Sequence, residues 1–478
     1  MSKWKKVKIG DICKIVKGTT GIASAEPGQY PLVVTAEERK TCSTYQFDCE
    51  AVCIPLVSSS GHGKKSLKNV HYQNGKFALG TILCAVIPNN PQELDARYLH
   101  QYLQFYKDII LVPLMKGAAN VSLSMKDIAT VEFPLPPIKR QRELSNLFVS
   151  LQEKQKELSA EYEKQTEYAK LLRQNILQEA IEGKLTADWR KQNPVQKGNP
   201  DYDAEALFEQ IQKGKVSPSL QPDKPSSATP SPRGKAPKTS GNSREFFEEK
   251  LDSERKRTNN ARSKSLSPIT DEEKPFDIPE GWKWVRLENI CSNIVDCPHT
   301  TPLKSNEKTQ YPCIRTSEIR NGEINWESMQ YIDYAEYKKR TARLIPQNND
   351  IVYAREGVFG DAVLLPEGYN FSLGQRTMLL RVLVNPKYVL NSILSPFLYE
   401  QALKQNRGAT VGHVNVADVK SFTITLPPLK EQEEIVNKVE TLLSKVTTLE
   451  NQIQDRKSLS DKLIFGIIKE NLEVKVND

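Results

Sequence analysis

The sequence has no long apolar run. Mean hydropathy is −0.54, and no stretch approaches the roughly 18 apolar residues that a membrane-spanning helix needs. The basic residues at the start, 1–10, are followed by no apolar segment of the kind found in signal peptides. We therefore expect a cytoplasmic protein without a membrane span or a secretion signal.

Cysteine is scarce and irregularly placed. The 478 residues include 8 cysteines, too few and too unevenly spaced for a disulfide scaffold in so long a chain, so reduced thiols are expected. Cys42, Cys49 and Cys53 lie near one another but do not form paired CxxC motifs. This spacing argues against a zinc site, and we predict no metal ligands.

Motifs of catalysis are missing as well. Residues 58–66, SSSGHGKKS, resemble a phosphate-binding loop, but Ser58 stands where the first glycine belongs and Lys65 where serine or threonine belongs. There is no dinucleotide fingerprint, no HExxH motif and no Asn-Pro-Pro-aromatic tetrad, and the 5 histidines show no triad spacing. We predict no catalytic residues and no cofactor in this chain. The net charge of +8 permits nucleic-acid binding without requiring it.

What the sequence does contain is a long-range repeat. PLPPIKRQREL, residues 134–144, returns as TLPPLKEQEEI, residues 425–435, at an offset of 291. The repeat extends upstream, where KGAANV from residue 116 aligns with RGATVG from residue 407, and WKKVKIGDIC from residue 4 with WKWVRLENIC from residue 282. The offset is 278 at Trp4 and 294 at Phe77, so insertions occur within the earlier segments. The chain is therefore two copies of one architecture.

In each copy, the sequence pattern changes at Leu-Pro-Pro, residues 135–137 and 426–428, which we call the Leu-Pro-Pro mark. Before it, β-branched runs closed by proline (residues 80–88 and 377–386) indicate strands, and residues 98–106 and 392–403 have helical patterns. We predict an α+β globule in each copy. The first proline of the mark ends a strand, and the second suits the first position of a helix.

After each mark, apolar residues recur in alternating steps of four and three, the heptad pattern of a coiled coil. The pattern predicts a long helix in each copy, and the two helices most simply pair with each other. Heptads alone leave the direction open; we expect an antiparallel coiled coil with pseudo-two-fold symmetry. The predicted apolar seam is Leu144, Phe148, Leu151, Leu158, Leu172, Ile176, Ile435, Val439, Leu442, Leu449, Ile453, Leu463 and Ile467.

These patterns give five segments. Residues 1–137 and 279–428 are the two globules, and residues 138–183 and 429–478 are the long helices. Residues 184–278 form a polar, partly disordered linker, because residues 217–241 are rich in proline, serine and lysine and nearly lack large apolar residues.

In order and duplication, these features resemble the specificity (S) subunit of type I restriction–modification systems. The stretches at residues 180–190, 281–302 and 354–365 are similar to that family too. The resemblance implies that each globule is a target-recognition domain reading one half of a bipartite DNA sequence. The helices would set the spacing and dock two methyltransferase subunits. S-adenosylmethionine, ATP and Mg would then belong to those partners and to motor–nuclease subunits.

Two alternatives stay open from the residues alone: a coiled-coil assembly protein without a DNA role, and a solitary nuclease with acidic metal ligands. For DNA binding, lysine and arginine would contact phosphates while other polar side chains read base edges. The candidates are Lys17, Thr19, Thr20, Ser58, Ser59, Ser60, His62, Lys64, Lys65, His299, Thr300, Lys304, Arg315, Arg320, Arg355 and Arg376.

Overall fold

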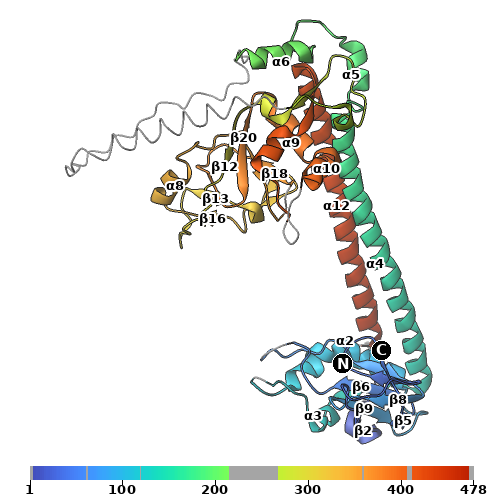
Figure 1. Ribbon diagram of the computed structural model, residues 1–478. Helices are drawn as coiled ribbons and strands as arrows, with labels where there is room; N and C mark the ends of the chain where they lie inside the picture. Colours follow the sequence, from blue (N-terminus) through green and yellow to red (C-terminus); the bar gives the residue numbers. More distant parts are fainter. Residues whose placement is uncertain are drawn as a thin grey trace, which may run out of the picture. The chain divides into compact units, whose positions relative to one another are not determined.

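The computed structural model describes residues 4–60, 63–118, 120–214, 267–357, 360–405 and 412–472 (Figure 1). These residues fall into two compact units. Unit 1 comprises Met1–Gln165 and Gln452–Asp478, and unit 2 comprises Thr166–Asn451. The candidate His62 and the proline-rich residues 217–241 lie outside the described residues.

Unit 1 contains globule 1, residues 4–137, built on two four-stranded sheets. The first has the order β2 (Cys13–Lys17), β9 (Leu83–Pro88), β6 (Ala51–Pro55), β7 (His71–Gln73). The second has the order β4 (Lys40–Cys42), β3 (Tyr30–Val33), β8 (Lys76–Leu79), β5 (Phe47–Asp48). A separate pair joins β1 (Lys6–Lys8) to β10 (Glu132–Pro134). The helices are α1 (Ile9–Ile12), α2 (Ala96–Ile110) and α3 (Met125–Ala129), with a 3-10 turn at Val112–Leu114.

Unit 2 contains globule 2, residues 267–428, with an equivalent four-stranded sheet. Its order is β12 (Cys291–Asp296), β20 (Thr377–Val382), β17 (Ile351–Ala354), β18 (Ala362–Leu364), and β11 (Lys283–Arg286) pairs with β21 (Thr423–Leu426). Shorter strands are β16 (Gln330–Tyr331), β13 (Pro312–Ile314), β19 (Ser372–Leu373), β14 (Ile319–Arg320) and β15 (Glu323–Ile324). The helices are α8 (Tyr334–Arg340), α9 (Pro386–Ile393), α10 (Pro396–Lys404) and α11 (Val416–Ser421).

The central strands β9 and β20 carry the core of each globule. Each begins with four consecutive buried residues, as expected for strands covered on both faces. A buried tyrosine then ties the following helix to the strand before the Leu-Pro-Pro mark. The Tyr98 hydroxyl donates to the Pro134 carbonyl and the Tyr388 hydroxyl to the Thr425 carbonyl, both at 2.9 Å. The two globules therefore share one fold, as the repeat predicts.

The glutamine of the repeated mark fixes the start of each long helix. Gln141 is fully buried, donates from Nε2 to the Pro136 carbonyl at 2.7 Å and accepts from the Asp95 amide at 2.8 Å. Gln432 makes the same pair of bonds, to the Pro427 carbonyl and from the Asn385 amide, at 2.8 and 3.0 Å. Asp95 and Asn385 are the N-caps of α2 and α9, so the glutamine joins two helix starts in each globule.

The long helices are α4 (Ile138–Ile181) and α12 (Leu429–Leu472), each of 44 residues. In unit 1, Gln155 Nε2 donates to Asp461 Oδ1 at 3.0 Å, and Arg140 near the start of α4 bonds Asn471 near the end of α12. In unit 2, Arg173 pairs with Glu450 at 2.9 Å, and Lys438 near the start of α12 bonds the carbonyl of Leu185, just after the end of α4. The pairing is therefore antiparallel within each unit, as predicted. Each unit holds one globule, the start of its own helix and the end of the other, which is the composition that pseudo-two-fold symmetry requires.

The predicted seam is wrong at three positions. Leu172, Leu449 and Leu463 are 45%, 41% and 61% exposed. Their neighbours turn toward the partner helix instead: Arg173 and Glu450 form the ion pair above, and Ile464 is buried. The reason is that a straight helix has 3.6 residues per turn, so a strict seven-residue repeat drifts by about 20° per heptad until the contact moves to the next residue. The other ten predicted positions are buried or partly buried.

The described ends of the predicted linker are packed against globule 2. Helix α5 (Ala187–Gln192) is followed by α6 (Ala204–Gln212), which buries Ala204, Leu207 and Ile211 in the core of unit 2. The carbonyls of Pro200 and Asp201 accept from the first amides of α12, those of Leu429 and Lys430. The linker assignment for residues 184–278 therefore needs correction over 184–214, where regularly spaced apolar residues in a polar stretch provide a packing face. It also needs correction over 267–278, because Arg286 bonds the Ser267 carbonyl and Glu273, and the Phe276 ring contacts Trp284. No described helix has the length and apolarity of a membrane span.

Candidate nucleic-acid interface

In each globule, most of the predicted DNA-binding residues lie at one end of the strands of the four-stranded sheet that contains β9 or β20. In globule 1, β2 and β6 are both antiparallel to β9, and their last residues lie opposite its start: Lys17 pairs with Cys84, and Pro55 with Leu83. The loops that follow β2 and β6 therefore leave the sheet at the same place. We call this place the loop edge.

Globule 2 has the same loop edge in the same register. The last residue of β12, Asp296, pairs with Met378, and the last residue of β17, Ala354, pairs with Thr377. The loops after β12 and β17 therefore flank the start of β20, as the loops after β2 and β6 flank the start of β9.

Backbone hydrogen bonds extend this equivalence beyond the strands. The amide of Leu56 donates to the Ile82 carbonyl at 2.8 Å in globule 1. The amide of Arg355 donates to the Arg376 carbonyl at 2.9 Å in globule 2. Leu56 and Ile82 of the first edge thus correspond to Arg355 and Arg376 of the second.

A β-bridge follows in each globule, between Val57 and Ser122 in the first and between Glu356 and His413 in the second. The backbone frame is therefore the same in the two loop edges. The side chains on it differ, because an aliphatic residue and a serine in globule 1 correspond to a carboxylate and an imidazole in globule 2.

In globule 1, the loop edge begins with Lys17 and two threonines. The Gln46 side chain accepts from the Thr19 amide at 3.0 Å and donates to the Lys17 carbonyl at 2.9 Å, which fixes the turn after β2. Thr20 forms a bridge to Gly80. Lys17 and Thr19 are exposed, so their side chains are available to a ligand.

The serines predicted to contact DNA form hydrogen bonds within their own loop. Ser58 Oγ accepts from the Ser66 amide at 3.2 Å, and Ser60 Oγ lies 2.7 Å from Ser66 Oγ. Ser59 Oγ accepts from the Lys68 amide at 2.9 Å. The adjacent Lys64 and Lys65 are exposed. The loop therefore uses its hydroxyls for internal hydrogen bonds and presents its ammonium groups to solvent.

A further lysine, missed from the sequence, lies beside this loop. Lys116 exchanges two backbone hydrogen bonds of 2.8 Å with Ser122, the bridge partner of Val57. Its ammonium group pairs with Asp127 at 3.2 Å. Hydrogen bonds from the Ser124 hydroxyl and from Lys116 lower the pKa of Asp127, so the carboxylate stays ionised.

In globule 2, the loop edge carries a charged network around Asp296. Asp296 Oδ2 lies 3.4 Å from Arg355 Nη1 and 3.2 Å from His299 Nε2. Arg355 is buried, and its Nε has no hydrogen-bond partner among the described residues. The His299 carbonyl accepts from Gln375 Nε2 at 3.0 Å, and the Thr300 carbonyl from Arg340 at 3.1 Å. His299 is the exposed member of this network.

A second network in globule 2 surrounds Glu356. One carboxylate oxygen pairs with Arg376 Nε at 2.9 Å, and the other lies 3.2 Å from His413 Nδ1. The Arg376 side chain is 57% exposed. Glu356, Asp296 and His413 were not predicted, since acidic residues are poor sequence signals for DNA binding and nothing in the spacing along the chain places them beside the arginines.

Three further predicted residues of globule 2 take no part in the ion pairs of Asp296 and Glu356. Arg315 is bound by Glu318, which accepts at 2.8 Å from the amide and at 3.1 Å from Nε of Arg315. Arg320 lies on β14 and donates to the Thr316 and Ile319 carbonyls. Lys304 is exposed in the loop before β13. Arg315 is therefore part of a local turn.

The thiols beside the loop edges are buried. Burial raises the pKa of Cys84, opposite Lys17, to about 12, and burial also raises the pKa of Cys297, just after β12. Such thiols are neutral and unreactive at neutral pH. No cluster of three or more His, Cys, Asp or Glu side chains with metal-binding geometry occurs in the described residues.

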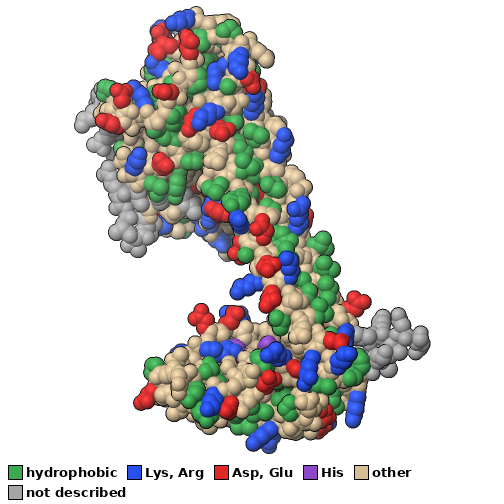
Figure 2. All heavy atoms as spheres, turned by 90° about the vertical axis from the view of Figure 1, so that its right-hand side faces the viewer, with side chains coloured by type: hydrophobic (Ala, Val, Ile, Leu, Met, Phe, Trp, Pro, Cys, Tyr) green, Lys and Arg blue, Asp and Glu red, His purple; other side chains and the backbone are tan. Residues whose placement is uncertain are grey.

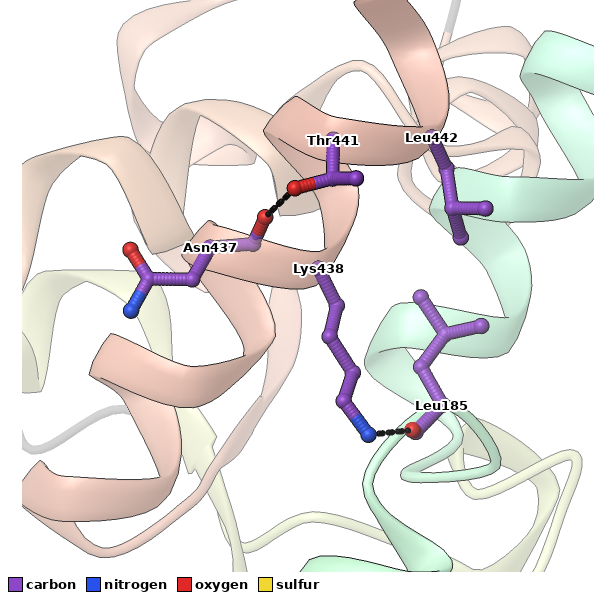
Figure 3. A pocket seen from close by; sticks show the side chains of 5 residues that line it. All are labelled: Leu185, Asn437, Lys438, Thr441 and Leu442. Atoms are coloured by element: carbon purple, nitrogen blue, oxygen red, sulfur yellow. Dashed lines mark hydrogen bonds between the residues drawn. The ribbon is translucent and has the colours of Figure 1, made fainter. Parts of the chain in front are cut away.

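A cavity of about 300 Å³ lies in unit 2, between α12 and the segment that follows α4 (Figure 3). Its lining is Leu185, Asn437, Lys438, Thr441 and Leu442. Lys438 Nζ donates to the Leu185 carbonyl at 3.0 Å, and the Thr441 hydroxyl donates to the Asn437 carbonyl at 2.8 Å. The Lys438 ammonium group and the Thr441 hydroxyl are thus bonded within the chain, and the cavity belongs to the packing between α12 and the segment that follows α4.

Each long helix also exposes an apolar pair at equivalent positions. In unit 2, α4 exposes Tyr168 and Leu172, which are one helical turn apart; in unit 1, α12 exposes Leu459 and Leu463 at the same offset of 291. Hydrophobic side chains are visible on the helical surface in Figure 2. Contiguous exposed apolar side chains of this kind are typical of protein-binding surfaces.

Known proteins share this architecture. Residues 1–167 and 279–456 match the family model described as "Type I restriction modification DNA specificity domain". The chain is 20% identical to the type I restriction enzyme EcoDI specificity subunit of Escherichia coli over 479 residues, covering 97% of this chain and 87% of that protein. It is 26% identical to the EcoAI specificity subunit of E. coli, a match that covers 41% of this chain but only 34% of that protein.

Two solved structures have the same fold along the chain. One comes from a study of complex assembly and conformational transition of the type I R-M system (TM-score 0.60, 13% identity, covering 99% of this chain and 98% of that one). The other is the HsdS subunit from Thermoanaerobacter tengcongensis (TM-score 0.50, 13% identity, 99% and 97%). Because the family model matches most of the sequence, once in each half, the chain belongs to the type I restriction modification DNA specificity domain family.

Proposed function

We propose that this chain is the DNA sequence-specificity subunit of a type I restriction–modification complex. Each globule reads one half of a bipartite target, and the paired helices fix the spacing between the halves. A helical pair suits this role because two half-sites at a fixed separation need rigidly joined readers. The function rests on family membership together with the chemistry of the two loop edges.

The observation that carries the proposal is one backbone frame with two sets of side chains. Equivalent positions hold Lys17 and Val57 in globule 1 but Asp296 and Glu356 in globule 2. A scaffold protein would have no need of different side chains on the same backbone frame. Two domains that read different base sequences need them, because base edges are distinguished by the donors and acceptors placed against them.

The helices also carry the docking surfaces for two methyltransferase subunits. The pair Tyr168 and Leu172 and the pair Leu459 and Leu463 are the same feature displayed twice, once in each unit. A surface that occurs twice in one chain suits two copies of one partner. This supports a stoichiometry of two methyltransferase subunits for each specificity subunit.

The chain itself catalyses nothing in this proposal. Methylation, with S-adenosylmethionine as methyl donor, belongs to the methyltransferase subunits. Cleavage, with ATP and Mg²⁺, belongs to motor–nuclease subunits. The alternatives, an assembly protein and a solitary nuclease, have no specific observation in their favour.

Mapping methylated adenines across the genome, with and without this chain, tests the function. We expect a bipartite methylated sequence that disappears when the chain is removed and returns when it is restored. Methylation that is independent of the chain, or a target with a single uninterrupted recognition sequence, would contradict the proposal.

A further inference from the structure

We propose that Arg376 reads a guanine in the half-site bound by globule 2, and that Glu356 is the residue that positions it. This inference rests on the proposed DNA-reading function and names the chemistry of one contact in it. It concerns a single position on the loop edge, immediately before β20.

The backbone at Arg376 is unusual. Its φ of 68° lies in the left-handed region that side chains other than glycine rarely adopt. The conformation is held from both sides: the Arg376 carbonyl accepts from the Arg355 amide at 2.9 Å, and β20 begins at Thr377. Strained residues of this kind concentrate at binding sites because the surrounding structure must keep them in place.

The Arg376 guanidinium group is fixed by an ion pair with Glu356. Arg376 Nε pairs with Glu356 at 2.9 Å, and Glu356 is itself held by His413 at 3.2 Å. No hydrogen bond joins Nη1 or Nη2 of Arg376 to another group within the part of the chain that the structure describes. Nη1 and Nη2 are therefore available to donate hydrogen bonds to a ligand, while the ion pair limits the conformational freedom of the Arg376 side chain.

Two parallel N–H donors on a fixed, planar group match the O6 and N7 acceptors of guanine in the major groove, the commonest specific contact that arginine makes with DNA. Phosphate would be the other acceptor for a fork of this kind. We favour base reading over a phosphate contact. A phosphate contact tolerates a mobile side chain and is weakened by a nearby carboxylate, so it gives no reason for the ion pair between Arg376 and Glu356.

The same position in globule 1 is Ile82, whose carbonyl accepts the equivalent hydrogen bond, from Leu56. An aliphatic side chain cannot reproduce a bidentate contact with guanine. The two half-sites must therefore be read differently at this position, and any effect of Arg376 is confined to the half-site of globule 2.

The test uses the full chain assembled with its methyltransferase subunits and a library of DNA duplexes randomised over both half-sites. Base preference is measured at each position for the wild type, Arg376→Gln, Arg376→Lys and Glu356→Gln. At one position of one half-site, Arg376→Gln should lower the preference for guanine by roughly 5- to 150-fold. Arg376→Lys, which keeps the charge but loses the fork, should lose nearly as much.

Glu356→Gln should keep guanine as the preferred base at that position but with a smaller preference, since it loosens the reader without removing it. Lys387→Gln is the matched control, because it removes one exposed cation from α9 of the same globule. The inference fails if no position of that half-site prefers guanine, if Arg376→Gln leaves every preference unchanged, or if Lys387→Gln has the same effect. A wild-type complex with no sequence preference would instead overturn the proposed function.

Discussion

Glu431 accepts a hydrogen bond from the indole nitrogen of Trp282 at 2.7 Å, inside the joint between globule 2 and α12. The same carboxylate accepts from the Thr186 hydroxyl at 2.6 Å and forms an ion pair with Arg190. One buried group on α12 thus ties together the start of globule 2 and the segment that follows α4. The corresponding residue of α4, 291 positions earlier, is Arg140, which is partly exposed and bonds Glu143 and Asn471.

Replacing Glu431 with alanine should therefore destabilise unit 2 strongly. The change leaves the Arg190 charge and the Trp282 indole without their acceptor, and breaking a buried pair in this way typically costs about 3–5 kcal/mol. Arg140→Ala at the equivalent position of α4 should cost under about 1 kcal/mol, because its ion pair is exposed to solvent. Chemical denaturation of the two variants checks this, and equal losses would mean that the buried joint is not specially stabilising.

The sequence predicted the elements that depend on local pattern. The repeated Leu-Pro-Pro and the heptads indicated where the long helices begin, and the structure starts them at Ile138 and Leu429. The repeat also indicated two globules of one fold. These features can be predicted because proline geometry and apolar spacing act over a few residues.

The features that were not predicted have different physical causes. The seam residues Leu172, Leu449 and Leu463 follow the seven-residue pattern, yet helix geometry gradually turns them to solvent. The hydrogen bond from the Ser66 amide to the Ser58 hydroxyl was not predicted, because the composition of this loop does not show which groups bond within it. Glu356 meets Arg376 only because the ends of β17 and β20 adjoin, and no spacing along the chain reveals that.

Lengthening both helices together should change the spacing of the recognised half-sites. Asp461 lies opposite Gln155, so one heptad inserted after Leu151 and another after Ile464 keeps the antiparallel register. Seven residues add about 10 Å of helix, equivalent to about three base pairs. Methylation mapping should show a longer gap or loss of methylation. Unchanged methylated sequences would rule out a measuring role for the helices.

The single insertion after Leu151 is the control for that experiment. It shifts α4 against α12 by one heptad on one side only, so it should misplace the pairs between the two helices and lower stability. Comparing the two variants distinguishes the effect of a longer helical pair from the effect of disrupted helix packing, because only the paired insertion lengthens the pair while keeping its contacts.

The exposed apolar pairs should each bind one methyltransferase subunit. Leu172→Glu should remove one copy from the assembled complex, Leu463→Glu the other, and the double variant both. Burying a glutamate in a docking surface should weaken each contact by at least about tenfold. Native mass spectrometry of the purified complex gives the number of copies bound.

Folding is the first concern for those variants. Both leucines are exposed in the free chain, so glutamate should change its stability by less than about 0.5 kcal/mol. Gln452→Glu, at an exposed glutamine on α12, adds the same single negative charge and is the control. Two methyltransferase subunits remaining on the double variant would show that these pairs are not the docking surfaces.

Exchanging one globule should change one half of the target and leave the other. Residues 1–135 end just before the Pro136–Pro137 pair, so replacing them with the corresponding segment of a relative keeps α4 and its register with α12. The buried Gln141 keeps the carbonyl of Pro136, which is not exchanged, but it needs an N-cap amide from the new globule, as it has from Asp95. We expect the methylated sequence to keep its gap and the half-site of globule 2. A change in both half-sites would mean that the globules do not read independently, and that the loop edges are not the separate readers that their different side chains indicate.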